Sequence, residues 1–305
     1  MKSAIVLSGG GARGAYEAGV VSVIQANTDT IPVVGGTSTG SLVSTLIAID
    51  EWDLMRLIYN GGVRTENIIR PLVLPKFLAG LANVFSDPAI WLGAATLFSK
   101  PAIYSIEPLM KIVDKHVDFQ DVLDSDVNVY FTTTNFRNLH TKYFSNFDGE
   151  SSADELRLGL FASVSEPVLM KYVVINGESY VDGGLTEFLP AMHAASAPNF
   201  SECDEVFFVD TNDPIDQLKP PKPPKQVLEK TFATLTKLVD VNCYMQAAFA
   251  RMQFEATHPG IEIHNISPSQ PLPIKNSLHF SPNEMKKAYA LGCADARKYF
   301  KKIDR

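Results

Sequence analysis

Short apolar runs alternate with longer amphipathic stretches from the first residues of the chain. Residues 4–8 and 31–35 are apolar runs of the length expected for buried strands, and the periodic residues 15–27 between them predict a helix. A second helical pattern covers residues 42–59. A strand, a helix and a strand in this order imply a right-handed crossover between two parallel strands.

The same alternation continues to the end of the chain. Further strands are predicted at residues 127–133, 140–145, 172–175, 205–209 and 261–266. Residues 226–257 predict one or two amphipathic helices, and a last helix is expected at residues 283–301, after Ser281 and Pro282. Strands separated by helices favour the α/β class, here as a layered α/β/α fold with a mainly parallel central sheet. Residues 1–305 are expected to form a single domain.

Two segments look like insertions into this pattern. Residues 71–104 are rich in Leu, Phe, Ala and Trp and are interrupted by four prolines. They predict either a set of short core helices or an apolar cap that faces lipid. Residues 219–225 read Lys-Pro-Pro-Lys-Pro-Pro-Lys, which predicts an exposed, semi-rigid loop.

Composition excludes several functional classes. The 305 residues carry a formal net charge of −7, which argues against a nucleic-acid surface and gives no general attraction to anionic membranes. Cys203, Cys243 and Cys293 are too far apart for a metal motif or a disulfide framework. No signal-peptide core and no run of about 18 apolar residues is present. We therefore expect a cytoplasmic protein without a spanning helix, peripheral where it meets membranes.

A possible nucleophile follows the second predicted strand. Gly36, Thr37, Ser38, Thr39 and Gly40 match Gly-x-Ser-x-Gly between a strand and a helix, which is the placement of a nucleophile elbow. Glycines two residues on either side of the serine relieve the crowding of so sharp a turn. An ordinary Gly/Ser/Thr turn is the alternative, because the pattern is short.

A glycine-rich loop follows the first strand. It consists of Gly9, Gly10, Gly11, Ala12, Arg13 and Gly14. The loop matches the dinucleotide-binding pattern Gly-x-Gly-x-x-Gly, but that site also needs a carboxylate at the end of the second strand, and Asp29 comes too early. A phosphate-binding Walker loop is also disfavoured, because no Gly-Lys-Ser/Thr follows. Fixed backbone N–H groups in such a loop suit an oxyanion hole, and the ends of two parallel strands bring it opposite the elbow.

A serine nucleophile also requires a base. Asp182, followed by Gly183 and Gly184, is the best-placed carboxylate, although Asp-Gly alone is typical of a tight turn. His193 and His279 follow Asp182 in the Ser, Asp, His order of α/β-hydrolases. That fold places several strands before its elbow, whereas only two precede this one. A Ser–Asp–His esterase is therefore the alternative hypothesis.

These three glycine-bearing motifs occur in an order that resembles the patatin-like phospholipases and acyl hydrolases. The residues that carry the resemblance are 7–16, 36–40 and 182–184, supported by residues 161–181 and by residues 291–296 near the end of the chain. The resemblance covers most of the chain and is weakest over residues 60–125 and 211–260. It implies a patatin-like fold with the elbow after the second strand.

The resemblance also implies chemistry. It implies a Ser38–Asp182 dyad without histidine, an oxyanion hole from the Gly9 to Gly14 loop, and hydrolysis of lipid acyl esters through an acyl-enzyme. No cofactor or metal is expected, and no calcium-loop pattern is present. The expected partner is a lipid or a membrane surface, with no nucleic acid or nucleotide; some members of the family require an activating protein. A catalytically silent lipid-binding module of the same fold is a second alternative.

Overall fold

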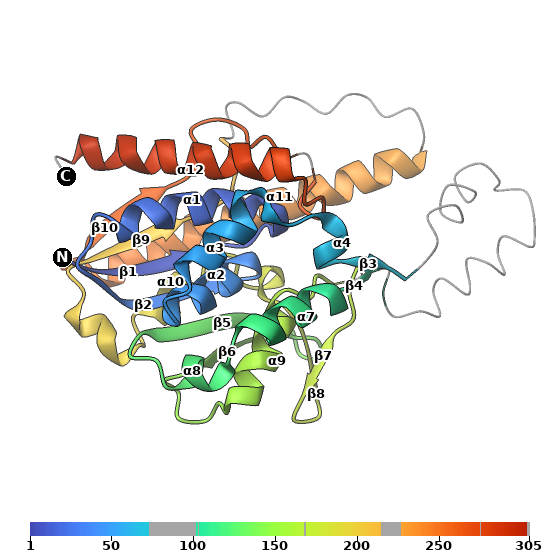
Figure 1. Ribbon diagram of the computed structural model, residues 1–305, viewed down its shortest axis with the longest axis horizontal. Coiled ribbons are helices and arrows are strands. Elements are labelled where there is room, and N and C mark those ends of the chain that lie inside the picture. The colour runs from blue at the N-terminus through green and yellow to red at the C-terminus, as the bar shows by residue number, and fades with distance from the viewer. Residues whose placement is uncertain (73–101, 103, 168, 215–226, 275, 304–305) are drawn as a thin grey trace, which may run out of the picture.

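A mixed β-sheet runs through the centre of the molecule, between layers of helices (Figure 1). The computed structural model describes residues 1–72, 102, 104–167, 169–214, 227–274 and 276–303. In this part of the chain the strand order is β10-β9-β1-β2-β5-β8-β7, and β6 also pairs with β5. The strands are β1 (Lys2–Leu7), β2 (Thr30–Thr37), β5 (Asn128–Asn135), β6 (Thr141–Ser145), β7 (Val173–Ile175), β8 (Glu178–Asp182), β9 (Glu205–Val209) and β10 (Glu262–Ile266), with a separate pair of β3 (Arg70–Pro71) and β4 (Tyr104–Ser105).

The strands β10, β9, β1, β2 and β5 run parallel to one another, whereas β6 and β8 are antiparallel to β5. The prediction of an α/β fold with a mainly parallel sheet is confirmed. The register also matters for the site. Thr37 pairs with Thr132, and the next residue of β5, Thr133, pairs with Asp182. The end of β2 and the end of β8 therefore lie one strand apart, on either side of β5.

Helices cover both faces of the sheet. On one face lie α1 (Gly14–Gln25), α2 (Thr39–Ala48), α3 (Trp52–Leu57), α9 (Ala153–Ser163) and α12 (Pro282–Lys302), and on the other α10 (Ala191–Ala194) and α11 (Val227–Thr257). Shorter helices are α4 (Thr65–Ile68), α7 (Glu107–His116) and α8 (Phe119–Leu123), with single turns at η1 (Gly11–Arg13), η2 (Ile58–Gly62), η3 (Gly183–Leu185) and η4 (Pro198–Glu202).

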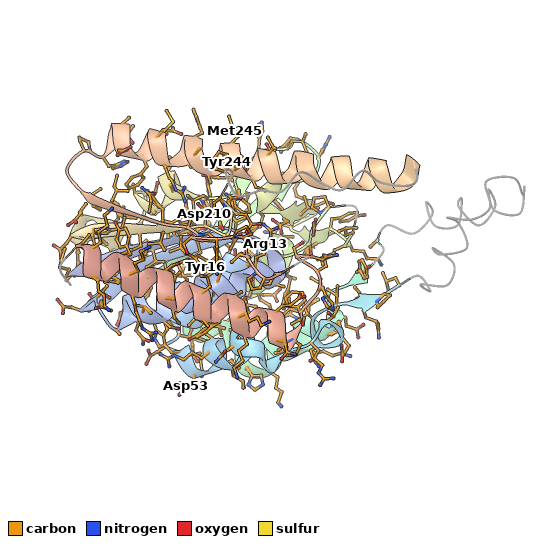
Figure 2. All side chains as sticks on the ribbon, turned by 90° about the horizontal axis from the view of Figure 1, so that it is seen from above. Arg13, Tyr16, Asp53, Asp210, Tyr244 and Met245 are labelled. Carbon is orange, nitrogen blue, oxygen red and sulfur yellow. The ribbon has the colours of Figure 1, made fainter. Side chains whose placement is uncertain are left out.

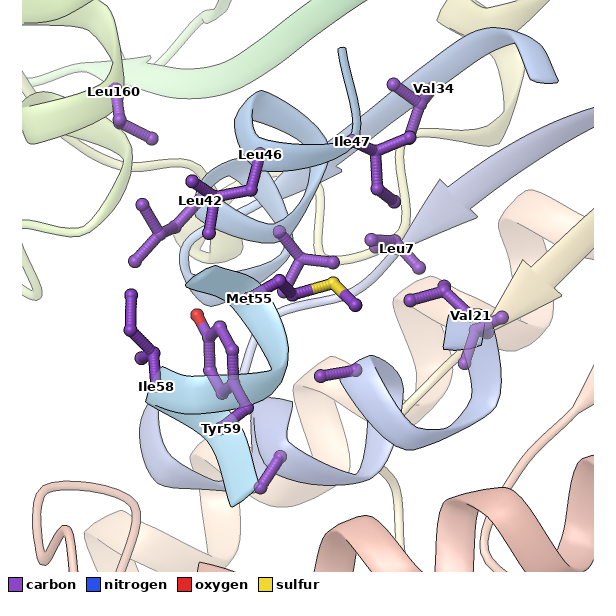
Figure 3. Packing of buried hydrophobic residues seen from close by; sticks show 14 of the residues in the cluster. Leu7, Val21, Val34, Leu42, Leu46, Ile47, Met55, Ile58, Tyr59 and Leu160 are labelled. Atoms are coloured by element: carbon purple, nitrogen blue, oxygen red, sulfur yellow. The ribbon is translucent and has the colours of Figure 1, made fainter. Parts of the chain in front are cut away.

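The strand sequence explains these two layers. Alternate residues of β1 point to opposite faces, so Ile5 and Leu7 enter the larger core cluster and Ala4 and Val6 the smaller one. All four side chains are fully buried, as is typical of a parallel sheet covered on both sides. Figure 3 shows the larger cluster, where Leu7 of β1 lies near Met55 of α3.

Two elements differ from the sequence prediction. The helix expected at residues 42–59 is divided, because Asp50 adopts a left-handed backbone (φ 59°) and the Glu51 amide bonds the Leu46 carbonyl, which ends α2. Strand β8 was not predicted, although Asp182 at its end was selected as the candidate base. Asn176 and Gly177, both with positive φ, join β7 to β8; this Asn-Gly pair is the hairpin signal that could have revealed the strand.

The two predicted insertions lie mainly outside the described residues. Of residues 71–104, the structure describes only Pro71, Leu72, Ala102 and Tyr104, and the strands β3 and β4 pair where this segment leaves and rejoins the fold. The Lys/Pro loop at residues 219–225 falls entirely outside them.

Candidate active site

Ser38 occupies a sharp turn between β2 and α2. Its backbone angles, φ 56° and ψ −122°, lie in a region that residues with a side chain rarely adopt. A Cβ at Gly36 would lie 2.6 Å from the carbonyl carbon of Gly40, and a Cβ at Gly40 would lie 2.2 Å from the carbonyl oxygen of Ser8. The turn therefore depends on both glycines, and it holds the half-buried Ser38 at the amino end of α2.

A chain of serine hydroxyls supports this turn from behind. The Ser163 hydroxyl, at the end of α9, accepts a hydrogen bond from the Ser38 amide at 2.9 Å. It also lies 2.8 Å from the hydroxyl of Ser41, which donates to the Gly36 carbonyl oxygen at 2.8 Å. Ser163 was part of the segment that carried the resemblance, but this contact spans 125 positions and could not be predicted from the sequence.

Asp182 faces Ser38 from the end of β8. Its Oδ1 accepts a hydrogen bond from the Gly184 amide at 2.7 Å. The residue is only 8% exposed. Burial, with a smaller contribution from the nearby Glu166 carboxyl, raises the pKa of Asp182 to about 7, and the Ser38 side chain and the Gly184 amide oppose this rise. An aspartate with this pKa can accept a proton near neutral pH.

The glycine loop closes over the same serine. A Cβ at Gly9 would lie 3.1 Å from the Ser38 Cβ, so the loop and the elbow are in direct contact. Three loop amides are already bonded: Ala12 donates to the Ser277 carbonyl, Arg13 to the Gly10 carbonyl, and Gly14 to the Gly11 carbonyl. Within the loop expected to form the oxyanion hole, these three amides therefore already have acceptors.

The remaining candidates are the amides of Gly9, Gly10 and Gly11, for which no bond is found within the described chain. Gly10 and Gly11 have φ of 141° and 55°, so the loop turns in a conformation that favours glycine. This geometry directs successive amides differently from those of a regular helix.

A buried hydrogen-bond network lies beneath the loop. Thr211 donates through its hydroxyl to the Gly9 carbonyl oxygen at 2.6 Å. The Ser8 hydroxyl donates to Glu17 Oε1 at 2.8 Å and accepts from the Thr211 amide at 3.2 Å. Glu17 is fully buried, and burial raises the pKa of its carboxyl well above the ordinary value. The sequence analysis did not identify Glu17 or Thr211.

The other motif residues have structural partners. The Arg13 guanidinium pairs with Asp213 at 3.6 Å, and Figure 2 places Arg13 near Tyr16 and Asp210, between α11 and α12. The Thr37 hydroxyl donates to the Glu187 carbonyl oxygen at 2.9 Å. The Thr39 hydroxyl lies 2.7 Å from that of Tyr59.

Helix α11 holds the aspartate motif in place. Its Gln246 accepts a hydrogen bond from the Phe188 amide at 2.6 Å and donates to the carbonyl oxygens of Gly184 and Leu185 at 3.5 and 3.4 Å. Gly183 and Gly184 form the turn η3 with Leu185. The Gly184 amide donates to the Asp182 carboxylate, while the Gly184 carbonyl oxygen accepts from Gln246. The Gln246 side chain of α11 therefore supports the loop that orients Asp182.

Comparison with known families agrees with this arrangement. A sequence model described as patatin-like phospholipase matches residues 5–195, more than half of the chain and all three motifs. The protein belongs to the patatin-like phospholipase family. Membership implies a lipid hydrolase.

Other comparisons add less. The structure of VipD from Legionella pneumophila is similar to this patatin-like chain with a TM-score of 0.49 and 12% sequence identity, over 99% of this chain and 67% of that one. No curated protein sequence matches the chain. Within the described residues, no helix has both the length and the apolar character needed to cross a membrane.

Among the described residues of this patatin-like chain, neither predicted histidine has a recorded contact with Ser38 or Asp182. The His193 ring stacks on Tyr143 with centroids 3.7 Å apart and meets Tyr130 edge-on, and burial lowers the pKa of His193 to about 4. His279 lies 3.7 Å from Glu284 at the start of α12. The two histidines therefore contact tyrosines and a glutamate rather than Ser38 or Asp182, which argues against the Ser–Asp–His alternative.

In the part of the chain that the structure describes, one group of residues could hold a metal ion. Glu205, Glu262 and His264 each offer a ligand atom, all within 4.8 Å of one another. His264 Nε2 lies 2.7 Å from a Glu205 oxygen, and Ser3 donates to the other Glu205 oxygen at 2.6 Å. These groups satisfy one another, and Glu205 and Glu262 begin β9 and β10, at the opposite end of the parallel strands from Ser38.

Proposed function

We propose that this protein hydrolyses carboxylic ester bonds of lipids, as a phospholipase A or lysophospholipase, through an acyl-enzyme on Ser38. The observation that carries the proposal is the placement of Ser38 beside Asp182, a buried carboxylate whose pKa is raised to about 7. It occurs at a strained turn of a chain from a lipid hydrolase family. A protein that only binds lipid has no use for such a pair.

In the first half of the reaction, Ser38 Oγ attacks the ester carbonyl carbon while its proton passes to Asp182. The carbonyl oxygen becomes an oxyanion, for which the amides of Gly10 and Gly11 are the proposed donors. The tetrahedral intermediate then collapses. The bond to the alcohol oxygen breaks, and Asp182 returns the proton to that oxygen, which leaves the acyl group on Ser38.

Water completes the cycle by the same route. It attacks the acyl carbon and gives its proton to Asp182, and the second intermediate expels Ser38 Oγ, which takes the proton back. The fatty acid and the free enzyme result. No histidine, metal or nucleotide takes part in this scheme.

Labelling with a fluorophosphonate probe tests the nucleophile. We expect wild type to be labelled and Ser38→Ala not to be, with circular dichroism of the two proteins unchanged. Ester turnover should be lost in Ser38→Ala and Asp182→Asn. Unlabelled wild type in the presence of lipid would instead support a silent lipid-binding module. A screen of phospholipids, lysophospholipids and triglycerides then identifies the substrate.

A further inference from the structure

Over residues 241–257, helix α11 is apolar on two opposite faces. Its inner face packs on the sheet through Ala247, Ala250 and Phe254, all buried. Its outer face carries a second apolar row, which is exposed: Val241 (49%), Met245 (61%), Phe249 (67%) and Met252 (68%). Figure 2 shows Met245 and Tyr244 on the outer side of the helix, away from the body of the molecule.

The outer residues form one continuous stripe. Spacings of four, four and three residues place them on the same side of an α-helix, and Tyr244, 39% exposed, flanks them. Between Val241 and Phe254 the only charged residue is Arg251, whose guanidinium pairs with Asp210. The stripe therefore presents large apolar groups to the surroundings with no charge among them.

Such a face requires an explanation. A helix on the surface of a globular protein normally has polar residues opposite its buried side, and contiguous exposed apolar side chains mark an interaction surface. Methionine adapts to irregular surroundings, and aromatic residues favour the boundary between lipid and water.

The stripe lies beside the candidate active site. Gln246, the residue after Met245, donates hydrogen bonds to the carbonyl oxygens of Gly184 and Leu185. The Leu185 side chain is itself 44% exposed. The same loop holds Asp182 through the Gly184 amide. A surface bound to the stripe would therefore meet the protein next to the loop that carries the proposed base.

We propose that the outer face of α11, formed by Val241, Met245, Phe249 and Met252, docks the protein on the surface of a lipid bilayer. This inference rests on the proposed function, since a lipid hydrolase must reach esters that lie in a bilayer. Insertion of uncharged side chains needs no anionic lipid, and the net charge of −7 opposes binding to anionic surfaces. Docking should therefore favour zwitterionic bilayers and tolerate salt.

Vesicle flotation tests the surface directly. Full-length protein is mixed with phosphatidylcholine vesicles, in a Ser38→Ala background so that the lipid stays intact. We expect the triple variant Met245→Ser, Phe249→Ser, Met252→Ser to bind at least about tenfold more weakly. Leu57→Ser is the matched control, because Leu57 is 65% exposed on α3, on the opposite face of the sheet, and should leave binding unchanged. Equal binding of the triple variant and wild type, or no binding of wild type, would overturn the proposal.

Activity separates this inference from the proposed function. With Ser38 intact, the triple variant should hydrolyse soluble p-nitrophenyl butyrate within about twofold of wild type but phosphatidylcholine vesicles about tenfold more slowly. If wild type hydrolyses neither substrate yet floats through α11, the proposed function fails and the docking face stands. If wild type is a dimer that the triple variant converts to a monomer, a second copy covers the stripe and the docking proposal is wrong.

Discussion

Ser38, directly after β2, and Asp182, the last residue of β8, lie on either side of β5, where the Ser38 side chain opposes the rise in the pKa of the Asp182 carboxylate. Strand register brings the two residues together. Thr37, which precedes Ser38, pairs with Thr132 of β5, and Asp182 pairs with the next residue of β5, Thr133. The buried Asp182 carboxylate and the strained backbone of Ser38 therefore occur at the same place in the fold. The free energy stored there is supplied by the packed layers around it.

The pKa of Asp182 predicts the pH dependence of turnover. Asp182 must be deprotonated to accept the Ser38 proton, and its pKa is raised to about 7 by burial. We therefore expect kcat/KM for a soluble ester to rise tenfold per pH unit below about 7 and to level off above it. A profile that levels off near the ordinary aspartate pKa of about 4 would contradict this assignment. Asp182→Asn should lower kcat by about 10²- to 10⁴-fold without the same pH step.

Ser163 is predicted to position the nucleophile. Ser163→Ala removes the acceptor of the Ser38 amide and a partner of Ser41, so we expect about 1 kcal/mol less stability and about tenfold lower kcat. Ser44→Ala is the matched control, because the Ser44 hydroxyl on α2 is buried and finds no hydrogen-bond partner among the described residues. It should leave both quantities unchanged. Thermal unfolding and ester turnover measure the two effects, and equal behaviour of the two variants would argue against a role of Ser163.

His193 is predicted to be dispensable for turnover. Its ring is held between Tyr143 and Tyr130, and its low pKa keeps it neutral at physiological pH. We expect His193→Gln to lose some stability through the lost aromatic contacts but to keep kcat/KM within a few-fold. A loss of several orders of magnitude, as for the histidine of a catalytic triad, would restore the Ser–Asp–His hypothesis.

Local signals allowed the elbow, the glycine loop and the aspartate motif to be predicted from the sequence. Strand β9 was predicted with its observed bounds, because five buried residues in a row leave little choice of structure. The contacts that complete the site could not be predicted. Ser163 and Gln246 reach Ser38 and Gly184 from positions 125 and 62 residues away, and only the packing of α9 and α11 brings them there.

Competition between local signals explains the errors. The 42–59 stretch keeps its apolar period through Asp50, so the left-handed turn there was hidden by the pattern around it. The amides of Ala12 and Arg13 looked equivalent to their neighbours until the structure showed a carbonyl within reach of each. The sequence analysis assigned no role to Glu17, which is fully buried and accepts a hydrogen bond from Ser8.

Glu17 is predicted to make stability depend on pH. Burial raises the pKa of its carboxyl well above the ordinary value, so the folded protein keeps a proton that the unfolded chain releases. Its contribution to stability is complete below the unfolded pKa and is lost as the pH rises through the folded pKa. Glu17→Gln keeps the shape and an acceptor for Ser8 but has no proton to lose.

The two proteins should therefore unfold alike near pH 4 and diverge above it. Wild type should lose about 1.4 kcal/mol per pH unit relative to Glu17→Gln until the folded carboxyl ionises. Urea unfolding between pH 4 and pH 8 gives the free energy of unfolding of both proteins. The contributions of the other acidic groups cancel when the two values are subtracted. A constant difference across the range would show that Glu17 is ionised in the folded state. Ester turnover should be similar in the two proteins at pH 7, because the Ser8 hydroxyl keeps its acceptor in Glu17→Gln.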